Sequence, residues 1–378
     1  LSSLTTTGAL NSGSITTGFG NINNGTSSLT TGSIATTTSG TSNFVAGVNA
    51  GNSIASGGNY NVLIGDEAGT AITTGDYNTA LGFEALAATT DRNSNTGIGA
   101  QTLKTNVNGA KNTALGSGAL FTMNPSTDVD TYNTAVGFDA GNDITTGVSN
   151  TLIGARNGDA LTVGNYNVAL GDEALGGDTK GSNSVAVGVG SLLNQNFTTA
   201  TAVYNTAIGH AAGNQVTTGV QNVIIGGLAG DALTDADYNI AIGYNALSTE
   251  TLGSRSVAIG YEALGVQNTT TAVNMLNVAV GYNAGAAVTT GVKNTLMGAN
   301  AGDALTDADE NVAVGHLSLT TDTRGSKSTA IGLSALHSQN FTTATDSHNT
   351  AVGHNAGYNV TTGVRNTLVG SGAGDSIT

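Results

Sequence analysis

The chain has 378 residues, of which 56 are Gly, one is Pro, none is Cys or Trp, and only 9% are charged. The formal net charge of −15 excludes a basic surface, so we expect neither nucleic acid nor an anionic membrane as a partner. With so few bulky side chains, we expect a thin, stacked core, and without Cys the chain forms no disulfides or thiolate metal sites.

No apolar run reaches transmembrane length, so we expect no membrane insertion. The chain begins at Leu1 rather than Met and shows no signal peptide. We therefore expect it to be a piece of a longer polypeptide.

Residues 1–42 are rich in Thr, Ser and Gly and contain single apolar residues, such as Leu4, Ile15 and Phe19, at irregular gaps. These gaps do not form a helical stripe, and the Gly residues would break a helix. Two interpretations remain: a flexible linker, or an intertwined β-stalk in which three chains pool their sparse apolar residues.

From residue 43 to residue 378 the chain is an array of a five-residue motif, exemplified by Asn-Thr-Ala-Ile-Gly at 205–209. The motif occurs nineteen times. Its first interval is 18, and the following intervals run 17, 17, 17 and 21, a superrepeat of 72. Fixed periodicity is typical of a solenoid, and a unit of this length suits one β-coil, here called a rung. We therefore predict an all-β, parallel β-solenoid. The motif begins at residues 43, 61, 78, 95, 112, 133, 150, 167, 184, 205, 222, 239, 256, 277, 294, 311, 328, 349 and 366.

Each motif position predicts a structural role. Position one is Asn in sixteen rungs and Ser in three, residue types that bond to backbone at turns and, for Asn, along a stack. Position five is always Gly, which predicts a corner with positive φ or a close backbone approach. Positions two to four carry no charge and are mostly aliphatic or β-branched, which predicts a strand buried on both faces. One coil covers only one face, so we expect a homo-oligomer.

The motif resembles the head repeat of trimeric autotransporter adhesins of the YadA type. The closest matches are Ser-Val-Ala-Val-Gly at 184–188 and Ser-Val-Ala-Ile-Gly at 256–260, and the eighth rung position is Ala in fifteen rungs, as in an Ala-rich second strand. The resemblance covers about residues 43–378 and implies a left-handed β-roll with three chains around one axis. The family's usual unit is shorter, and its heads lack the 17-17-17-21 rhythm.

The stretch at 13–20, Gly-Ser-Ile-Thr-Thr-Gly-Phe-Gly, looks like segments of bacteriophage tail fibres, which also use the adhesin-head repeat. The two resemblances imply a homotrimeric tail fibre shaft or receptor-binding segment in the virion. Its partners would be a host-surface glycan or protein receptor and other virion tail proteins. The alternative is the head of a bacterial trimeric adhesin, exposed on the cell surface.

The four long rungs, those followed by the interval of 21, contain the best candidates for receptor contact, because loops on a rigid scaffold commonly perform recognition. An exposed Phe could stack on a sugar ring; the alternative is that it folds back and packs against the loop or a neighbouring chain. The candidate residues are Asn124, Tyr132, Asn196, Phe197, Tyr204, Asn268, Asn340, Phe341 and His348.

Two sets of polar residues are weaker candidates for metal binding. Asp231, Asp235 and Asp237 cluster carboxylates as a Ca²⁺ site would, but their spacing lacks the Gly and distal Glu of an EF-hand, and a solvated acidic turn is the alternative. His210, His316 and His354 share rung position six without any His-x-His pair, and we expect surface or packing roles for them. We therefore predict no metal site and no cofactor.

Enzymatic activity is not expected. The sequence contains no nucleophile elbow, phosphate loop or zinc motif. The carboxylate pairs Asp66–Glu67 and Asp172–Glu173 occupy the same repeat positions as Tyr261–Glu262, which indicates surface positions rather than a glycosidase site. Ice binding is not expected either, since Thr-Thr pairs recur only every fourth rung and predict no continuous array.

Overall fold

The structure is a computed structural model that describes residues 38–378, so most of the predicted stalk at 1–42 lies outside the described residues. Residues 38–42 already belong to the first coil. There the Thr41 amide donates a hydrogen bond of 2.9 Å to the Asn59 side chain, and the Thr41 carbonyl accepts one of 3.0 Å from Tyr60. The described residues contain strands and turns, and no helix there is long and apolar enough to cross a membrane.

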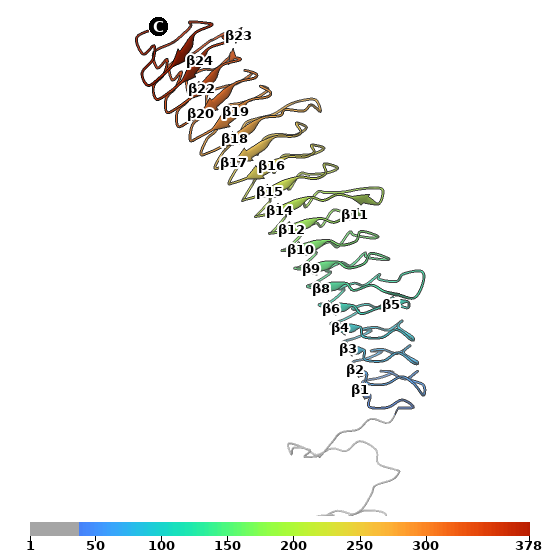
Figure 1. The fold of residues 1–378 in the computed structure, drawn as a ribbon. Coiled ribbons are helices and arrows are strands. Elements are labelled where there is room, and N and C mark those ends of the chain that lie inside the picture. Colours follow the sequence, from blue (N-terminus) through green and yellow to red (C-terminus); the bar gives the residue numbers. More distant parts are fainter. Residues whose placement is uncertain (1–37) are drawn as a thin grey trace, which may run out of the picture. The chain divides into compact units, whose positions relative to one another are not determined.

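The described chain is a parallel β-solenoid of about 19 coils stacked in one column (Figure 1). Each motif forms a three-residue strand at positions two to four, and each strand pairs in parallel with the strand of the next rung. Equal motif positions lie opposite one another, so Ala207 faces Ile224. The prediction of an all-β parallel solenoid is confirmed. The motif strands are β1 (Phe44–Ala46), β2 (Val62–Ile64), β3 (Thr79–Leu81), β4 (Thr96–Ile98), β6 (Thr113–Leu115), β8 (Thr134–Val136), β9 (Thr151–Ile153), β10 (Val168–Leu170), β12 (Val185–Val187), β14 (Thr206–Ile208), β15 (Val223–Ile225), β16 (Ile240–Ile242), β17 (Val257–Ile259), β18 (Val278–Val280), β19 (Thr295–Met297), β20 (Val312–Val314), β22 (Thr329–Ile331), β24 (Thr350–Val352) and β25 (Thr367–Val369).

Short additional strands mark the long rungs. The end of each long rung pairs in parallel with the end of the rung before it, which fastens the inserted residues to the column. In the third long rung this pairing is reduced to a single bridge between Ser254 and Asn274. The short strands are β5 (Gly109–Ala110), β7 (Val129–Asp130), β11 (Gly181–Ser182), β13 (Thr201–Ala202), β21 (Gly325–Ser326) and β23 (Thr345–Asp346).

The Gly at motif position five combines both features that the sequence predicted for it. Gly209 has φ of +140°, and a Cβ built on it would lie 2.4 Å from the carbonyl oxygen of Gly226, the equivalent Gly of the next rung. Backbones therefore approach so closely at this corner that no other residue fits. The same geometry recurs from Gly47 to Gly353.

The Asn at motif position one serves each coil twice. In the rung that begins at Asn222, the side-chain nitrogen donates to the Ala236 carbonyl at 2.8 Å and so closes the coil, while the side-chain oxygen accepts the Asn239 amide of the next rung at 2.9 Å. Asn222 is fully buried, and its bonds replace the water that its amide would otherwise need. Both predicted uses of this Asn, at a turn and along the stack, are confirmed.

The core is one cluster that runs inside the column. Its members come from motif position three, the Ala-rich eighth position and their neighbours. The side-chain volumes at rung positions three and nine compensate for each other: where position three is large, as at Leu296, position nine is Gly. A Cβ at Gly302 would lie 2.8 Å from a Leu296 methyl group. A thin core therefore reaches close packing without bulky residues on both sides.

Motif positions two and four point out of the coil and form what we call the outward face of the sheet. In β14 the middle residue, Ala207, is fully buried, whereas Ile208 remains 39% exposed. The same alternation occurs in almost all motif strands. One of the two faces expected to be buried is therefore covered by the coil, and the other is open in the single chain.

Candidate functional site

A buried carboxylate lies at the base of the inserted residues in three of the four superrepeats. Asp178, Glu250 and Asp322 are fully buried, one rung before the long rung. The Asp178 carboxylate accepts the amide of Gly181 at 3.0 Å, the amide of Phe197 at 3.3 Å and the side-chain amide of Gln195 at 2.6 Å. The carboxylate thus ties the start of the insertion to the preceding rung.

The Gln that donates to this carboxylate also takes over hydrogen bonds that the motif-position-one Asn makes in other rungs, because its own rung has Ser at that position. The three rungs with Ser at motif position one are the three with Gln eleven positions later. Gln195 donates to the Ser184 hydroxyl at 3.1 Å and accepts from the Asn205 side chain at 2.9 Å. Ser is therefore not an equivalent of Asn in these rungs, since its small side chain makes room for the Gln amide.

The first superrepeat shows a matched replacement of the whole set. Asn106, Asn112 and Met123 stand where the second superrepeat has Asp178, Ser184 and Gln195, and Pro125 stands at the place of Phe197. Pro has no amide hydrogen, so Pro125 cannot make the hydrogen bond that the Phe197 amide donates to Asp178. The first superrepeat therefore lacks both the carboxylate and this donor. The sequence contained this signal as a Ser–Gln pair that recurs with the period of the superrepeat, but our reading of the sequence missed it.

Burial raises the pKa of the Asp178 carboxyl above its ordinary value, while the bonds from Gln195 and from the Gly181, Phe197 and Lys180 amides oppose this shift. Four donors around one carboxylate make a structural anchor. The donors also occupy both oxygens, so the Asp178 carboxylate is not presented to a ligand.

The structure divides the nine predicted contact residues into three groups. Phe197 and Phe341 are only 6% exposed, so their rings pack inward and the folded-back alternative holds. Tyr132, Tyr204 and His348 are exposed and directly precede a motif. The remaining four, Asn124, Asn196, Asn268 and Asn340, continue a row of Thr residues along the column.

That row takes a single Thr from each of several successive rungs and is distinct from the Thr-Thr pairs, which recur every fourth rung. The Thr217 hydroxyl donates to the Thr234 carbonyl, and Thr234 donates in turn to Thr251, at 3.2 and 2.9 Å. Thr251 then donates to Asn268 at 3.0 Å, so Thr occupies three successive rungs and Asn the fourth. Asn interrupts the Thr row at every fourth rung and Val107 interrupts it once more, so the Thr array is not continuous, and its hydroxyls bond within the column.

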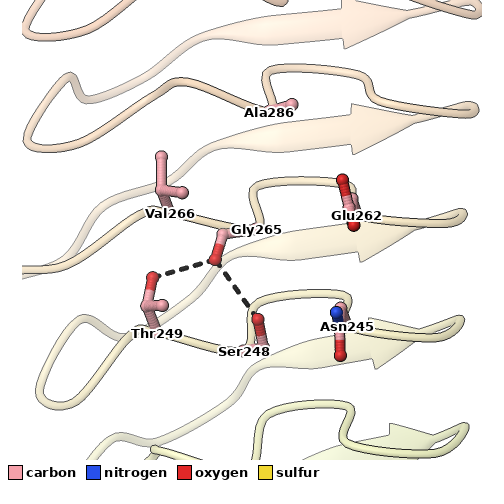
Figure 2. A pocket seen from close by; sticks show the side chains of 7 residues that line it. All are labelled: Asn245, Ser248, Thr249, Glu262, Gly265, Val266 and Ala286. Atoms are coloured by element: carbon pink, nitrogen blue, oxygen red, sulfur yellow. Dashed lines mark hydrogen bonds between the residues drawn. The ribbon is translucent and has the colours of Figure 1, made fainter.

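A shallow hollow of about 270 Å³ lies on the side of the column between the rungs of β16 and β18 (Figure 2). The hydroxyls of Ser248 and Thr249 both point to the Gly265 carbonyl, at 3.3 and 2.9 Å, on one side of the hollow. Asn245 and Glu262 lie on the other side (Figure 2). Glu262 is the hollow's single acidic residue, so no carboxylate pair of the kind that cleaves glycosides lines it.

The weak calcium candidates bind protein groups separately. Asp235 accepts the Thr218 hydroxyl at 2.6 Å, and Asp237 accepts the Val220 amide at 2.8 Å. Burial raises the pKa of the Asp231 carboxyl, which disfavours its charged form. Within residues 38–378 no three His, Cys, Asp or Glu side chains come together as a metal site, so the structure does not bring Asp231, Asp235 and Asp237 together as ligands.

The carboxylate pairs considered for catalysis lie on the surface. Asp172 and Glu173 are held by Arg156, whose guanidinium is 3.6 and 2.9 Å from their oxygens. His210, His316 and His354 are exposed at the position directly after the motif Gly. No family model and no curated protein matches the chain.

Proposed function

We propose that the chain is a structural and adhesive fibre protein: a homotrimeric shaft and receptor-binding segment of a bacteriophage tail fibre that attaches the virion to its host. The observation that supports the proposal most is the outward face of the sheet. Its two rows, motif positions two and four, contain no charged residue in any of the nineteen rungs. Side chains such as Leu81, Ile208 and Met297 remain 38–44% exposed along the column.

An open apolar face of this length needs a cover. Parallel sheets are normally buried on both faces, and large exposed apolar patches mark interaction surfaces. Copies that run parallel around one axis would direct every such face inward. Three copies is the number that the resemblance to the adhesin heads implies.

The shape of the array fits an attachment role. A column of stacked coils is an extended structure with its two ends far apart (Figure 1). The insertions recur at every fourth rung along this column. Repeated loops on three chains would bind a host glycan or protein by many weak contacts. Other virion tail proteins would hold the fibre on the particle.

Assembly is tested by the mass of the purified chain in solution, from light scattering or sedimentation. We expect three times the chain mass of 37.1 kDa. A folded monomer at micromolar concentration would overturn the assembly and with it the fibre.

Attachment is tested with an antibody against residues 43–378 and immunogold electron microscopy. Labelled phage tails would support the tail fibre. Label on a bacterial surface instead would favour the alternative, an adhesin head, which the motif resemblance also supports. Purified trimer should in addition compete with the phage for adsorption to its host, and absence of competition would overturn receptor binding.

A further inference from the structure

Two rows of side chains border the outward face. The preceding row is the residue directly before each motif, and the following row is the residue directly after each motif Gly. Side chains within one row stack along the column: the rings of Tyr60 and Tyr77 lie 5.0 Å apart in the preceding row. In the following row, Tyr261 lies 5.7 Å from Tyr244 and 5.3 Å from Tyr282. Both rows are half-buried or exposed in the single chain.

The two rows match in size or chemistry in most rungs. In several rungs an aromatic residue in one row accompanies an aromatic residue in the other, and in several a small residue accompanies a small one. The clearest pairs are Tyr77 with Phe83, Tyr132 with Phe138, Tyr238 with Tyr244, Ser94 with Ala100 and Ser149 with Ala155. Opposite or complementary polarity appears as well, in Glu310 with His316, Arg255 with Tyr261 and Tyr166 with Asp172.

Two of the exceptions have a local cause, and two further pairs of unequal size, Tyr60 with Asp66 and Arg365 with Ser371, have no such explanation. Lys111 and Lys293 are long side chains that accompany the small residues Ser117 and Ala299. Each is already engaged along its own column, Lys111 with Asp130 at 2.7 Å and Lys293 with a glutamate of the next rung at 3.1 Å. A side chain held in this way needs no large residue opposite it.

Contacts within one chain do not explain the match. The two residues of a pair are six positions apart on either side of a three-residue strand, a separation of at most about 20 Å. Among the described residues, no hydrogen bond, ion pair or ring contact joins the preceding row to the following row. A size match between side chains that do not touch in one chain indicates that they touch between copies.

The match also selects a vertical register. A shift of one rung in one direction would set Ser149 beside Phe138 and Tyr238 beside Gly227. A shift in the other direction would set Tyr132 beside Ala155. Of these three alignments, the alignment of equal rungs best keeps large residues with large and small residues with small.

We propose that the preceding row of one copy packs against the following row of the next copy in the same rung, so that the copies run parallel and level. A rotation about an assembly axis that runs parallel to the column brings opposite borders of the outward face together between neighbouring copies, as in a heterologous ring interface. An antiparallel pair would instead set the preceding row against itself. The proposal rests on the proposed assembly and specifies which residues meet in it.

The absence of Cys from the chain permits a direct test by cross-linking. The variant Ser94→Cys/Ala100→Cys replaces a small pair, where the backbones of two copies should come closest. A disulfide needs Cα atoms about 4.4–6.8 Å apart. Oxidation should give covalent dimers and trimers on a non-reducing gel, and a short bis-maleimide reagent should give the same products where the sulfur atoms are too far apart for a disulfide.

The matched control is Ser94→Cys/Ser117→Cys, which pairs the same preceding residue with the following row one rung away. The control and both single variants, Ser94→Cys and Ala100→Cys, should stay uncross-linked. The mass of each reduced variant is measured first. A monomer overturns both the assembly and the register. A trimer that links in the control, in a single variant, or in no variant with either reagent overturns the register alone.

Discussion

Gly and Asn at the ends of each motif fix the path of the coil at single residues. Two conditions require Gly at motif position five: its positive φ and the close carbonyl of the next rung. Replacing it should therefore lower the free energy of unfolding more than replacing a Gly at an ordinary corner. The chain offers a comparison between two successive rungs. Gly209 meets both conditions, whereas a Cβ on Gly227 would only touch the Tyr244 ring at 3.6 Å.

Gly209→Ala should therefore destabilise its rung by at least about 2 kcal/mol, since a left-handed backbone and a clash both oppose the new methyl group. Gly227→Ala should stay within about 0.5 kcal/mol. Amide hydrogen exchange of the peptides around residues 205–226 measures the difference. Equal protection in the two variants would contradict the close approach at this corner.

Gln195 illustrates a dependence between residues that a single position does not reveal. Its amide bonds Asp178, Ser184 and Asn205 at once. Gln195→Met copies the first superrepeat at one position only and leaves these three groups without their partner. We expect a loss of about 1–3 kcal/mol, measured by hydrogen exchange over residues 178–205.

The control for this substitution completes the copy. Asp178→Asn/Ser184→Asn/Gln195→Met recreates the set Asn106, Asn112 and Met123 of the first superrepeat and should recover most of the lost protection. If the triple variant exchanges as fast as Gln195→Met alone, the three positions do not act as a set.

The sequence was sufficient to predict the roles of residues whose type recurs at one motif position. Gly at position five and Asn at position one recur at a fixed period, and their backbone chemistry follows from their type. The Ser–Gln substitution was not recognised, because Ser and Asn both act as turn residues and the partner lies eleven positions away. A buried carboxylate was equally hidden, since charge alone predicts a solvated surface.

At the scale of elements, the insertions are fastened segments with small exposed tips. Two predicted contact residues, Phe197 and Phe341, are buried because their amides bond a carboxylate and their rings fill the base of the insertion. The sequence located the insertions correctly by their length, but it did not show which side chains point outward. What remains at the tips is small and polar, as at Thr198 and Thr199.

The anchor of the second insertion should depend on pH. The raised pKa of Asp178 means that the folded state binds this proton more tightly than the unfolded state. Its contribution to stability is fully present below the ordinary carboxyl pKa of 3.8 and is lost as pH rises through the raised value. Relative to Asp178→Asn, the wild-type chain should therefore lose protection around Phe197 as pH increases across this window.

Hydrogen exchange at several pH values, corrected for the intrinsic exchange rate, measures this difference. The Asn variant supplies the reference because it cannot ionise at this position. A wild-type chain that gains protection relative to the variant with rising pH would show that the hydrogen-bond donors outweigh burial and hold the pKa below its ordinary value.

At the scale of the whole molecule, the coil buries only one of the two faces of its sheet. The periodic pattern predicted a strand with two covered faces, and one chain provides the cover for one. This limit is physical, because a rung this short forms one thin layer around its own core. The number of copies and the residues that meet between them are properties of the assembly.

Ile208→Asp tests the whole-molecule argument at its centre. Ile208 lies on the outward face and outside the coil's own core, so the single chain should keep its strands by circular dichroism. In the proposed trimer, each copy would bury an unpaired charge close to the others, which is strongly unfavourable. We expect the solution mass to fall to that of one chain. Thr198→Asp, which adds the same charge on an exposed insertion tip, should remain trimeric; a trimer in both variants would mean that the outward face is covered by something other than copies of this chain.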